Sequence, residues 1–399
     1  MTGALSDWIV CQIGAREHYG IAKGLMRCGA LTQLYTDIWA TPGSPLSKVS
    51  SKLRGRFDPE VAKAEVHAFN FGALSQRAIA KIGRLPDREA ILRYNSWFEK
   101  SVSNAIKMAH SHKPATRHVF AYSYAALSIF RTAKDLGWPT ILGQIDPGPK
   151  EAEIVSRLAD THGLRDSHFT RNYHSYWASW REEVDLADLV VVNSQWSKEA
   201  LTDVGITETK ILVLPLSYEN SVRPLEPKGR TEKLKILFLG QANPRKGIIE
   251  LIEASKLLVG KDVEIEIVGP APPEIQHILK ETATVNWKGP QPRSEVGKFY
   301  READALILPT HSDGFAITQY EALSYGVPVI ASHRCGKVIE DGKNGLLLSS
   351  ISGQEIANHI NQLINDPSLL FKLKAGAAST KIPYPEEIAS YLMQACEHI

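Results

Sequence analysis

The stretch "DGFAITQYEALSYGVPVI", residues Asp313–Ile330, contains the pattern that decides the fold. Gly314 and Phe315 predict a short loop. A helix of about eleven residues should follow, because Gly326 is a typical helix terminator. The β-branched run from Val327 to Ile330 then predicts a buried strand. A loop, a helix and a strand in this order are typical of an α/β domain with a parallel sheet.

Two carboxylates frame the predicted helix. Asp313 precedes it and Glu321 lies within it, so their backbones should stand roughly 10–12 Å apart along the axis. That length suits a nucleotide diphosphate sugar, and the free N–H groups of the helix N-terminus favour a diphosphate. A capping Asp and a solvated Glu would give the same pattern. Spacing alone leaves both interpretations open.

The same residues resemble the signature of retaining glycosyltransferases of family 4, in which a Glu-Gly-Phe loop is followed by Glu-Ala and Gly-x-Pro-Val. The matching residues are Gly314, Phe315, Glu321, Ala322, Gly326, Pro328 and Val329. Asp313 stands where the family usually has Glu. The resemblance implies that Glu321 binds the ribose hydroxyls and that Asp313 touches the donor sugar. It also implies that the diphosphate meets the backbone amides of Gly314, Phe315, Ala316 and Ile317.

A second candidate anion site lies in "LGQANPRKGIIELIEA", where a strand, a glycine turn and a basic pair precede a helix. Basic loop residues are also commonly just solvated. The family pattern implies that Lys246 and Arg245 act catalytically, by stabilising the charge on the departing diphosphate. Gln241 follows Gly240 where the family has Arg, and Arg245 would supply the missing charge. Gly240, Gln241 and Lys337 complete the predicted donor-binding residues.

No metal or cofactor is predicted. The chain contains no Asp-x-Asp sequence, and the resemblance implies catalysis without an essential metal ion. The donor substrate should be a nucleotide diphosphate sugar, with UDP- and GDP-sugars as the favoured classes.

The first half of the chain should hold the acceptor. Strand Trp8–Ile13 runs into a turn at Gly14 and then a helix, as in a Rossmann-like unit. The resemblance implies that Gly14, Arg16, Glu17 and His18 face the acceptor side. Further along, Asp146 in "QIDPGP" is a candidate catalytic carboxylate. It could equally shape the turn with the Pro and Gly that follow it.

The order of strands and helices predicts two α/β domains. Residues 1–217 form the first Rossmann-like domain, 218–233 a linker rich in Pro and charge, and 234–382 the second, nucleotide-sugar-binding domain. Residues 383–399 should be a helix, and the resemblance implies that it crosses back to the first domain. The implied architecture is GT-B, with two parallel-sheet domains facing across a cleft.

Charge is uneven along the chain. Residues 1–120 contain 17 Lys and Arg against 9 Asp and Glu, an excess of 8, although the whole chain carries only +2. This excess indicates either an ordinary solvated surface or a face for anionic lipid or an anionic acceptor. No nucleic-acid-binding signature accompanies it, so we expect no nucleic-acid partner. No signal segment or membrane span is recognisable, which predicts a cytoplasmic protein, with peripheral contact at the inner face of the membrane as a further expectation.

The resemblance to family 4 implies a retaining, metal-independent glycosyltransferase that acts on a glycan, lipid-linked or small-molecule acceptor in polysaccharide or glycolipid biosynthesis. Two alternatives remain open at this point. A GT-B sugar-nucleotide epimerase would isomerise a similar donor, and a non-catalytic protein would only bind it.

Overall fold

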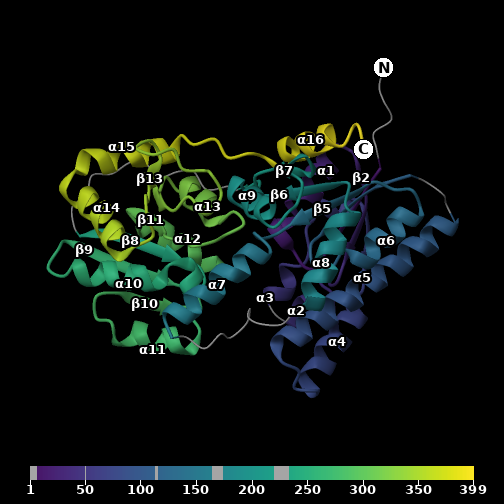
Figure 1. Cartoon of the computed structure of the whole chain (residues 1–399), viewed down its shortest axis with the longest axis horizontal. Coiled ribbons are helices and arrows are strands. Elements are labelled where there is room, and N and C mark those ends of the chain that lie inside the picture. The colour runs from purple at the N-terminus through teal and green to yellow at the C-terminus, as the bar shows by residue number, and fades with distance from the viewer. Residues whose placement is uncertain (1–6, 50, 113–115, 164–173, 220–232) are drawn as a thin grey trace.

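The computed structural model describes residues 7–49, 51–112, 116–163, 174–219 and 233–399. Two parallel sheets organise these residues into two bodies (Figure 1). The first sheet has the order β3-β2-β1-β4-β5-β6-β7. Its strands are β1 (Trp8–Gln12), β2 (Leu31–Thr36), β3 (Glu65–Ala68), β4 (His118–Tyr122), β5 (Thr140–Gln144), β6 (Leu189–Val192) and β7 (Ile211–Val213).

Helices connect these parallel strands, as crossover connections require. They are η1 (Arg16–Tyr19), α1 (Gly20–Arg27), α2 (Pro45–Val49), α3 (Ser51–Arg54), η2 (Val61–Lys63), α4 (Asn70–Ile82), α5 (Asp87–His112), α6 (Leu127–Asp135), α7 (Pro149–Thr161), α8 (His174–Leu186), α9 (Gln195–Asp203) and η3 (Glu208–Lys210). The central strands β1, β4 and β5 have almost wholly buried side chains, because helices cover both faces of the sheet.

The second sheet has the order β10-β9-β8-β11-β12-β13. Its strands are β8 (Leu234–Leu239), β9 (Val263–Val268), β10 (Asn286–Gly289), β11 (Ala305–Leu308), β12 (Val329–Ala331) and β13 (Gly345–Leu347). The accompanying helices are η4 (Pro244–Lys246), α10 (Ile248–Leu257), α11 (Pro273–Glu281), α12 (Arg293–Glu302), α13 (Thr318–Ser324), α14 (Gly353–Asn365) and α15 (Pro367–Ala378). In both sheets the strand order turns around the first strand of the domain. This reversal opens a crevice at the carboxyl ends of the strands.

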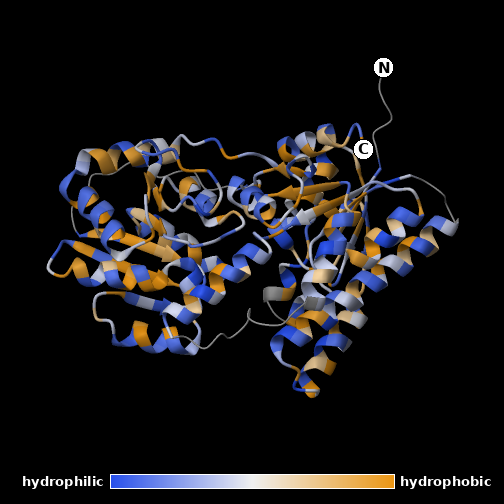
Figure 2. Cartoon of the chain, in the orientation of Figure 1, coloured by the Kyte–Doolittle hydropathy of each residue, from blue (hydrophilic) through white to orange (hydrophobic). Residues whose placement is uncertain are grey.

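The last helix, α16 (Pro385–Ala395), leaves the second domain and packs on α1 of the first. Ile388, Ala389 and Leu392 are buried in the apolar core beneath α1. Figure 1 shows this yellow helix above the purple and teal first domain, and Figure 2 shows apolar residues concentrated along both sheets. Most of the predicted linker, 220–232, lies outside the described residues.

The prediction of parallel α/β domains is confirmed, and the predicted strand Trp8–Ile13 corresponds to β1, which ends at Gln12. Two strands were missed, β2 and β3, which extend the first sheet beyond β1. The predicted eleven-residue helix is wrong, because α13 has only seven residues. Ala316 has a left-handed φ of 62°, so the chain cannot be helical before Ile317.

A search for membrane-spanning helices gives a negative result. Among the described residues, no helix is both long enough and apolar enough to cross a bilayer.

Candidate active site

A cavity of about 460 Å³ lies between the two domains. The first domain lines it with Glu17, His18 and Lys23, and the second with Arg293, Tyr300 and Glu321. Polar and charged side chains from both domains thus converge on one space, as in a site for a polar ligand.

Glu321 is the predicted donor-binding residue that lines this cavity. Its Oε2 accepts a 2.8 Å hydrogen bond from the Tyr300 hydroxyl, and Arg293 Nη2 lies 3.8 Å from Oε1. The side chain is only 13% exposed. Tyr300, which is buried in the second domain, therefore orients a carboxylate that is partly turned toward the cavity.

His18 meets Arg293 across the cavity, with 2.9 Å between His18 Nε2 and Arg293 Nη2. Burial, followed by the charges of Arg293 and Lys23, lowers the pKa of His18 to about 4. The imidazole is therefore neutral near pH 7, and Nε2 can accept the guanidinium hydrogen. His18 and its neighbours Glu17 and Tyr19 have φ values of 50–62°, a conformation that costs about 1–2 kcal/mol per residue. This left-handed turn places His18 against the second domain.

We predict that Arg293→Ala raises the pKa of His18 toward the ordinary value of about 6.5. The reason is that the variant removes a positive charge and opens the side chain to solvent. NMR titration of the His18 ring would measure the effect, with His18→Gln used to assign the signal. Arg301→Ala, on the same helix but against the Tyr325 ring, is the matched control. An unchanged pKa in Arg293→Ala would contradict the contact between the domains.

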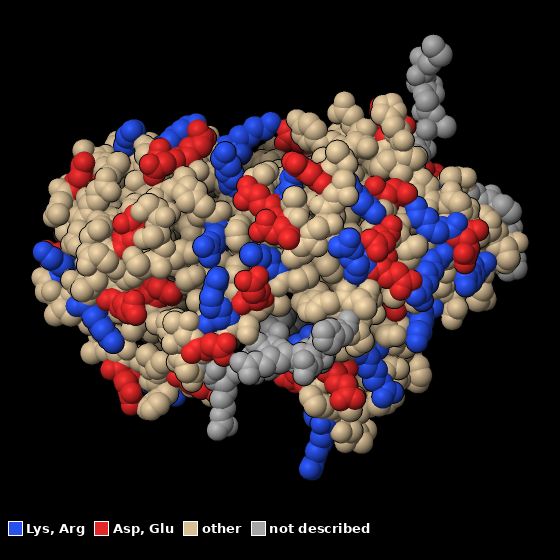
Figure 3. Space-filling view, in the orientation of Figure 1, with Lys and Arg blue, Asp and Glu red and all other residues tan. Residues whose placement is uncertain are grey.

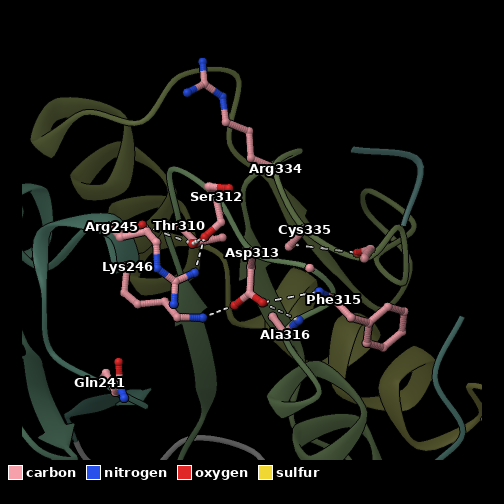
Figure 4. Close-up of polar contacts among 12 residues, drawn as sticks. Gln241, Arg245, Lys246, Thr310, Ser312, Asp313, Phe315, Ala316, Arg334 and Cys335 are labelled. Carbon is pink, nitrogen blue, oxygen red and sulfur yellow. Dashed lines mark hydrogen bonds and ion pairs between the residues drawn. The ribbon is translucent and has the colours of Figure 1, made fainter. Parts of the chain in front are cut away.

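Lys246 and Asp313 form a second polar centre (Figure 4). The Lys246 ammonium is in direct contact with Asp313 Oδ2. Asp313 Oδ1 accepts hydrogen bonds from the backbone N–H groups of Ala316 and Phe315, at 3.1 and 3.3 Å. Burial and the nearby Arg245 lower the pKa of Lys246, whereas contact with the Asp313 carboxylate favours its charged form.

This arrangement changes the predicted roles of the loop. Two of the amides that were expected to meet a diphosphate, those of Phe315 and Ala316, are bound to Asp313 in the described structure. The spacing of 10–12 Å along one helix axis also does not apply, because Asp313 precedes α13 by a non-helical loop. An anionic ligand would therefore compete with Asp313 for Lys246 and for these amides.

Arg245 lies beside this centre and reaches the first domain. Its Nη1 donates a 2.6 Å hydrogen bond to the Ser312 carbonyl and lies 3.4 Å from Glu151 Oε2. Ser312 Oγ also donates to Glu151 Oε2, at 2.7 Å. Burial raises the pKa of Glu151, and the Arg245 guanidinium opposes this effect. Arg245 thus links the domains, a contact that the sequence analysis did not foresee.

The two domains are in close contact at Gly314. A Cβ atom at this position would lie 2.5 Å from the Ile145 carbonyl oxygen, so a side chain would force the backbones apart. Ser197 Oγ donates to the Gly314 carbonyl at 3.4 Å, and Trp196 Nε1 donates to Ser312 Oγ at 3.2 Å. The loop after β11 is therefore held from both sides of the interface.

Asp146 takes the turn-forming contacts that were one of its two predicted roles. Its Oδ1 accepts hydrogen bonds from the Gly148 N–H at 2.9 Å, from the Tyr124 hydroxyl at 2.6 Å and from Gln144 Nε2 at 3.0 Å. Trp180 Nε1 in turn donates to Gln144 Oε1. The carboxylate is anchored by these donors at the carboxyl end of β5, close to the interface.

The predicted acceptor-side residues contact different parts of the structure. Gly14 has a φ of 76° and its N–H donates to Asp37 Oδ1 at 2.8 Å. Arg16 lies over the Tyr122 ring, 5.5 Å from its centroid. Glu17 accepts hydrogen bonds from Tyr122 and from Asn193 Nδ2, and burial raises its pKa. Only His18 of the set reaches the second domain.

Other predicted donor residues lie apart from Lys246. Gln241 lies just before η4, is exposed to solvent and forms a hydrogen bond with Asn243. Figure 4 shows it well away from Asp313. Lys337 is exposed to solvent in the segment between β12 and β13. Glu151, Arg293 and Tyr300 were not predicted, because no local motif marks a residue whose partner lies in another domain or element.

The described residues contain no group of three or more His, Cys, Asp or Glu side chains arranged to hold a metal ion. The polar centres found here are hydrogen-bonded carboxylates paired with Lys and Arg.

Two parallel-sheet domains with a polar cavity between them define a protein of the GT-B fold. Residues 225–380 match the family model described as glycosyl transferases group 1. The second domain of this chain is thus similar to the glycosyl transferases group 1 family.

Curated relatives agree with this assignment. The chain is 26% identical over 202 residues to the capsular polysaccharide biosynthesis glycosyltransferase CapM of Staphylococcus aureus, covering 46% of this chain and 53% of that protein. It is 29% identical over 160 residues to a D-inositol 3-phosphate glycosyltransferase of Streptomyces bingchenggensis, covering 36% and 35%. The chain therefore spans about half or less of the length of these relatives.

Solved structures resemble the whole chain. HepE of Anabaena, solved with UDP and glucose, superposes with a TM-score of 0.63 at 16% identity, over 99% of this chain and 100% of that one. A sucrose-phosphate synthase of Thermosynechococcus elongatus gives a TM-score of 0.69 at 16% identity, over 97% and 98%. At this identity the similarity establishes the fold.

Proposed function

We propose that this protein is a retaining glycosyltransferase that moves a sugar from a nucleotide diphosphate sugar to an acceptor held by the first domain. The observation that carries the proposal is the pairing of Lys246 with Asp313 in the loop after β11, beside the junction of the two domains. The match of residues 225–380 to the glycosyl transferases group 1 model and the names of the relatives support the reaction class. The resemblance of residues 313–330 to family 4 supports retention of configuration.

The donor would place its nucleoside at Glu321 and its diphosphate near Lys246. When the bond from the anomeric carbon to the phosphate oxygen breaks, negative charge grows on the departing diphosphate. A lysine ammonium in a mostly buried site stabilises such charge strongly, because little water screens it. In this proposal no metal ion takes part, and Lys246 moves from Asp313 to the phosphate oxygens.

The donor and acceptor classes are also proposals. HepE was solved with UDP and glucose, which favours a UDP-sugar, with GDP-sugars as the next candidates. CapM acts in capsular polysaccharide biosynthesis by its name, which supports a glycan or lipid-linked acceptor. A small-molecule acceptor would fit the inositol phosphate relative.

Donor choice can be measured by a thermal-shift screen with UDP, GDP, ADP and their sugars. We expect one nucleotide family to stabilise the protein, by about 2.7 kcal/mol at a concentration of about 100 times its dissociation constant. The stabilising sugar nucleotide is then incubated with candidate acceptors, and NMR of the product reads its anomeric configuration. Retained configuration in the presence of EDTA would support the proposal. An isomerised nucleotide sugar formed without acceptor, or binding without turnover, would contradict it.

A further inference from the structure

The helical hairpin α4–α5 of the first domain carries an apolar stripe that faces solvent. Phe71 and Ile82 are 86% and 83% exposed, and Leu74 and Ile79 are also exposed. Five of the thirteen exposed large apolar side chains in the described chain fall within residues 71–91, the fifth being Ile91 on α5. Such side chains are normally scattered singly over a protein surface, so this clustering requires a reason.

The stripe follows the helical period. At about 100° per residue, Phe71, Leu74, Ala78 and Ile82 lie on one side of α4. Ala73, the buried residue of this helix, falls on the opposite side. A stripe of this spacing usually packs into a core, whereas here the core takes the other face. The apolar stripe therefore faces solvent, where an apolar surface outside the protein can contact it.

Positive charge borders the stripe. Residues 70–86 contain Arg77, Lys81 and Arg84 and no Asp or Glu. Arg77 is tied to Asp37 and Tyr94. The side chains of Lys81 and Arg84 are exposed, and no hydrogen bond or ion pair joins either side chain to another part of the described chain. These two cations can thus pair with an outside anion.

The hairpin also projects from the molecule. Figure 1 shows α4 and α5 running side by side and extending below the sheet of the first domain. Apolar residues appear at the foot of this hairpin in Figure 2, and basic side chains extend from the same region in Figure 3. A projecting helix can lie on a flat surface without obstruction by the remainder of the protein.

We propose that α4 and the α4–α5 turn form a docking surface for an anionic lipid bilayer. The stripe from Phe71 to Ile82 would enter the boundary between headgroups and acyl chains, with α4 parallel to the membrane plane. Lys81 and Arg84 would meet anionic headgroups. A bilayer is the preferred occupant, because an apolar stripe bordered by unpaired cations complements its apolar interior and its negative surface together. This proposal would also give a role to two of the basic residues in the excess of residues 1–120, Lys81 and Arg84.

Vesicle flotation with the full chain tests this proposal. The wild-type protein should float with phosphatidylcholine vesicles that contain phosphatidylglycerol, bind pure phosphatidylcholine weakly, and dissociate from the anionic vesicles as salt rises. The double variant Phe71→Ser/Ile82→Ser should bind anionic vesicles about tenfold or more weakly, since it removes two side chains from the stripe. Lys81→Glu should also weaken binding and reduce its dependence on salt.

Matched controls use exposed residues of the second domain. Val259→Ser/Phe371→Ser and Lys261→Glu change similar surface side chains outside the hairpin and should leave flotation unchanged. A melting temperature near the wild-type value would show that each variant folds. Unchanged flotation of the hairpin variants, or no flotation of the wild type, would overturn the proposal. A concentration-dependent dimer that the same substitutions abolish, without lipid binding, would make the surface a protein contact and overturn it as well.

Discussion

Replacing Lys246 by alanine should lower kcat on the order of 10²–10³, the loss seen when one well-placed electrostatic contact to developing charge is removed. Lys246 is expected to bind the departing diphosphate more strongly in the transition state than in the intact donor. The affinity for the intact donor should therefore fall much less than kcat. Steady-state kinetics for turnover, together with calorimetry for donor binding, would separate the two effects.

The matched control is Lys256→Ala, which removes an exposed lysine from α10 in the same domain and should leave kcat unchanged. Lys246→Ala also leaves Asp313 without its ammonium partner, so Lys246→Ala/Asp313→Asn should be made beside it. If the double variant recovers wild-type turnover, the loss came from the stranded carboxylate and the catalytic role is wrong. A rise in KM alone, or dependence of the wild type on added divalent cation, would also contradict this role.

Glu321→Ala should weaken nucleotide binding by about 10- to 150-fold. This range corresponds to the 1.5–3 kcal/mol typical of a hydrogen bond to a charged group. In the cavity, Tyr300 holds one carboxylate oxygen and Arg293 lies near the other. The carboxylate is thus pre-oriented toward the proposed ribose. Calorimetry with the nucleotide found in the donor screen would measure the loss.

Two further variants make this result specific. Glu321→Gln keeps an acceptor for the Tyr300 hydroxyl, so it should retain stability while still weakening nucleotide binding. Glu295→Ala, an exposed residue of α12, should bind nucleotide like the wild type. Equal affinity of all three variants for the nucleotide would remove Glu321 from the donor site.

The repeated strand and helix patterns of this chain were readable because they depend on local side-chain periodicity. Strands β6 and β8, which are wholly or mostly apolar, are readable in this way. Strands β2 and β3 escaped notice, since polar residues interrupt both of them. The length of α13 was overestimated because the left-handed conformation of Ala316 has no local sequence signal. In that loop the Asp313 carboxylate binds the Ala316 N–H.

By itself, the sequence determined the two α/β domains and placed Lys246, Asp313 and Glu321 in one candidate site. The domains follow from the periodicity of apolar residues, whereas the candidate site follows from the resemblance of these short motifs to family 4. Tertiary structure alone decided the partners: Lys246 meets Asp313, Arg245 turns to Glu151, and His18 reaches Arg293. Each pair joins residues at least 67 positions apart. Lys246 and Asp313 meet within the second domain, whereas the other two pairs join the two domains, and no local sequence pattern encodes either kind of contact. The charges that surround a ligand were therefore set by the tertiary fold and by how the two domains pack together.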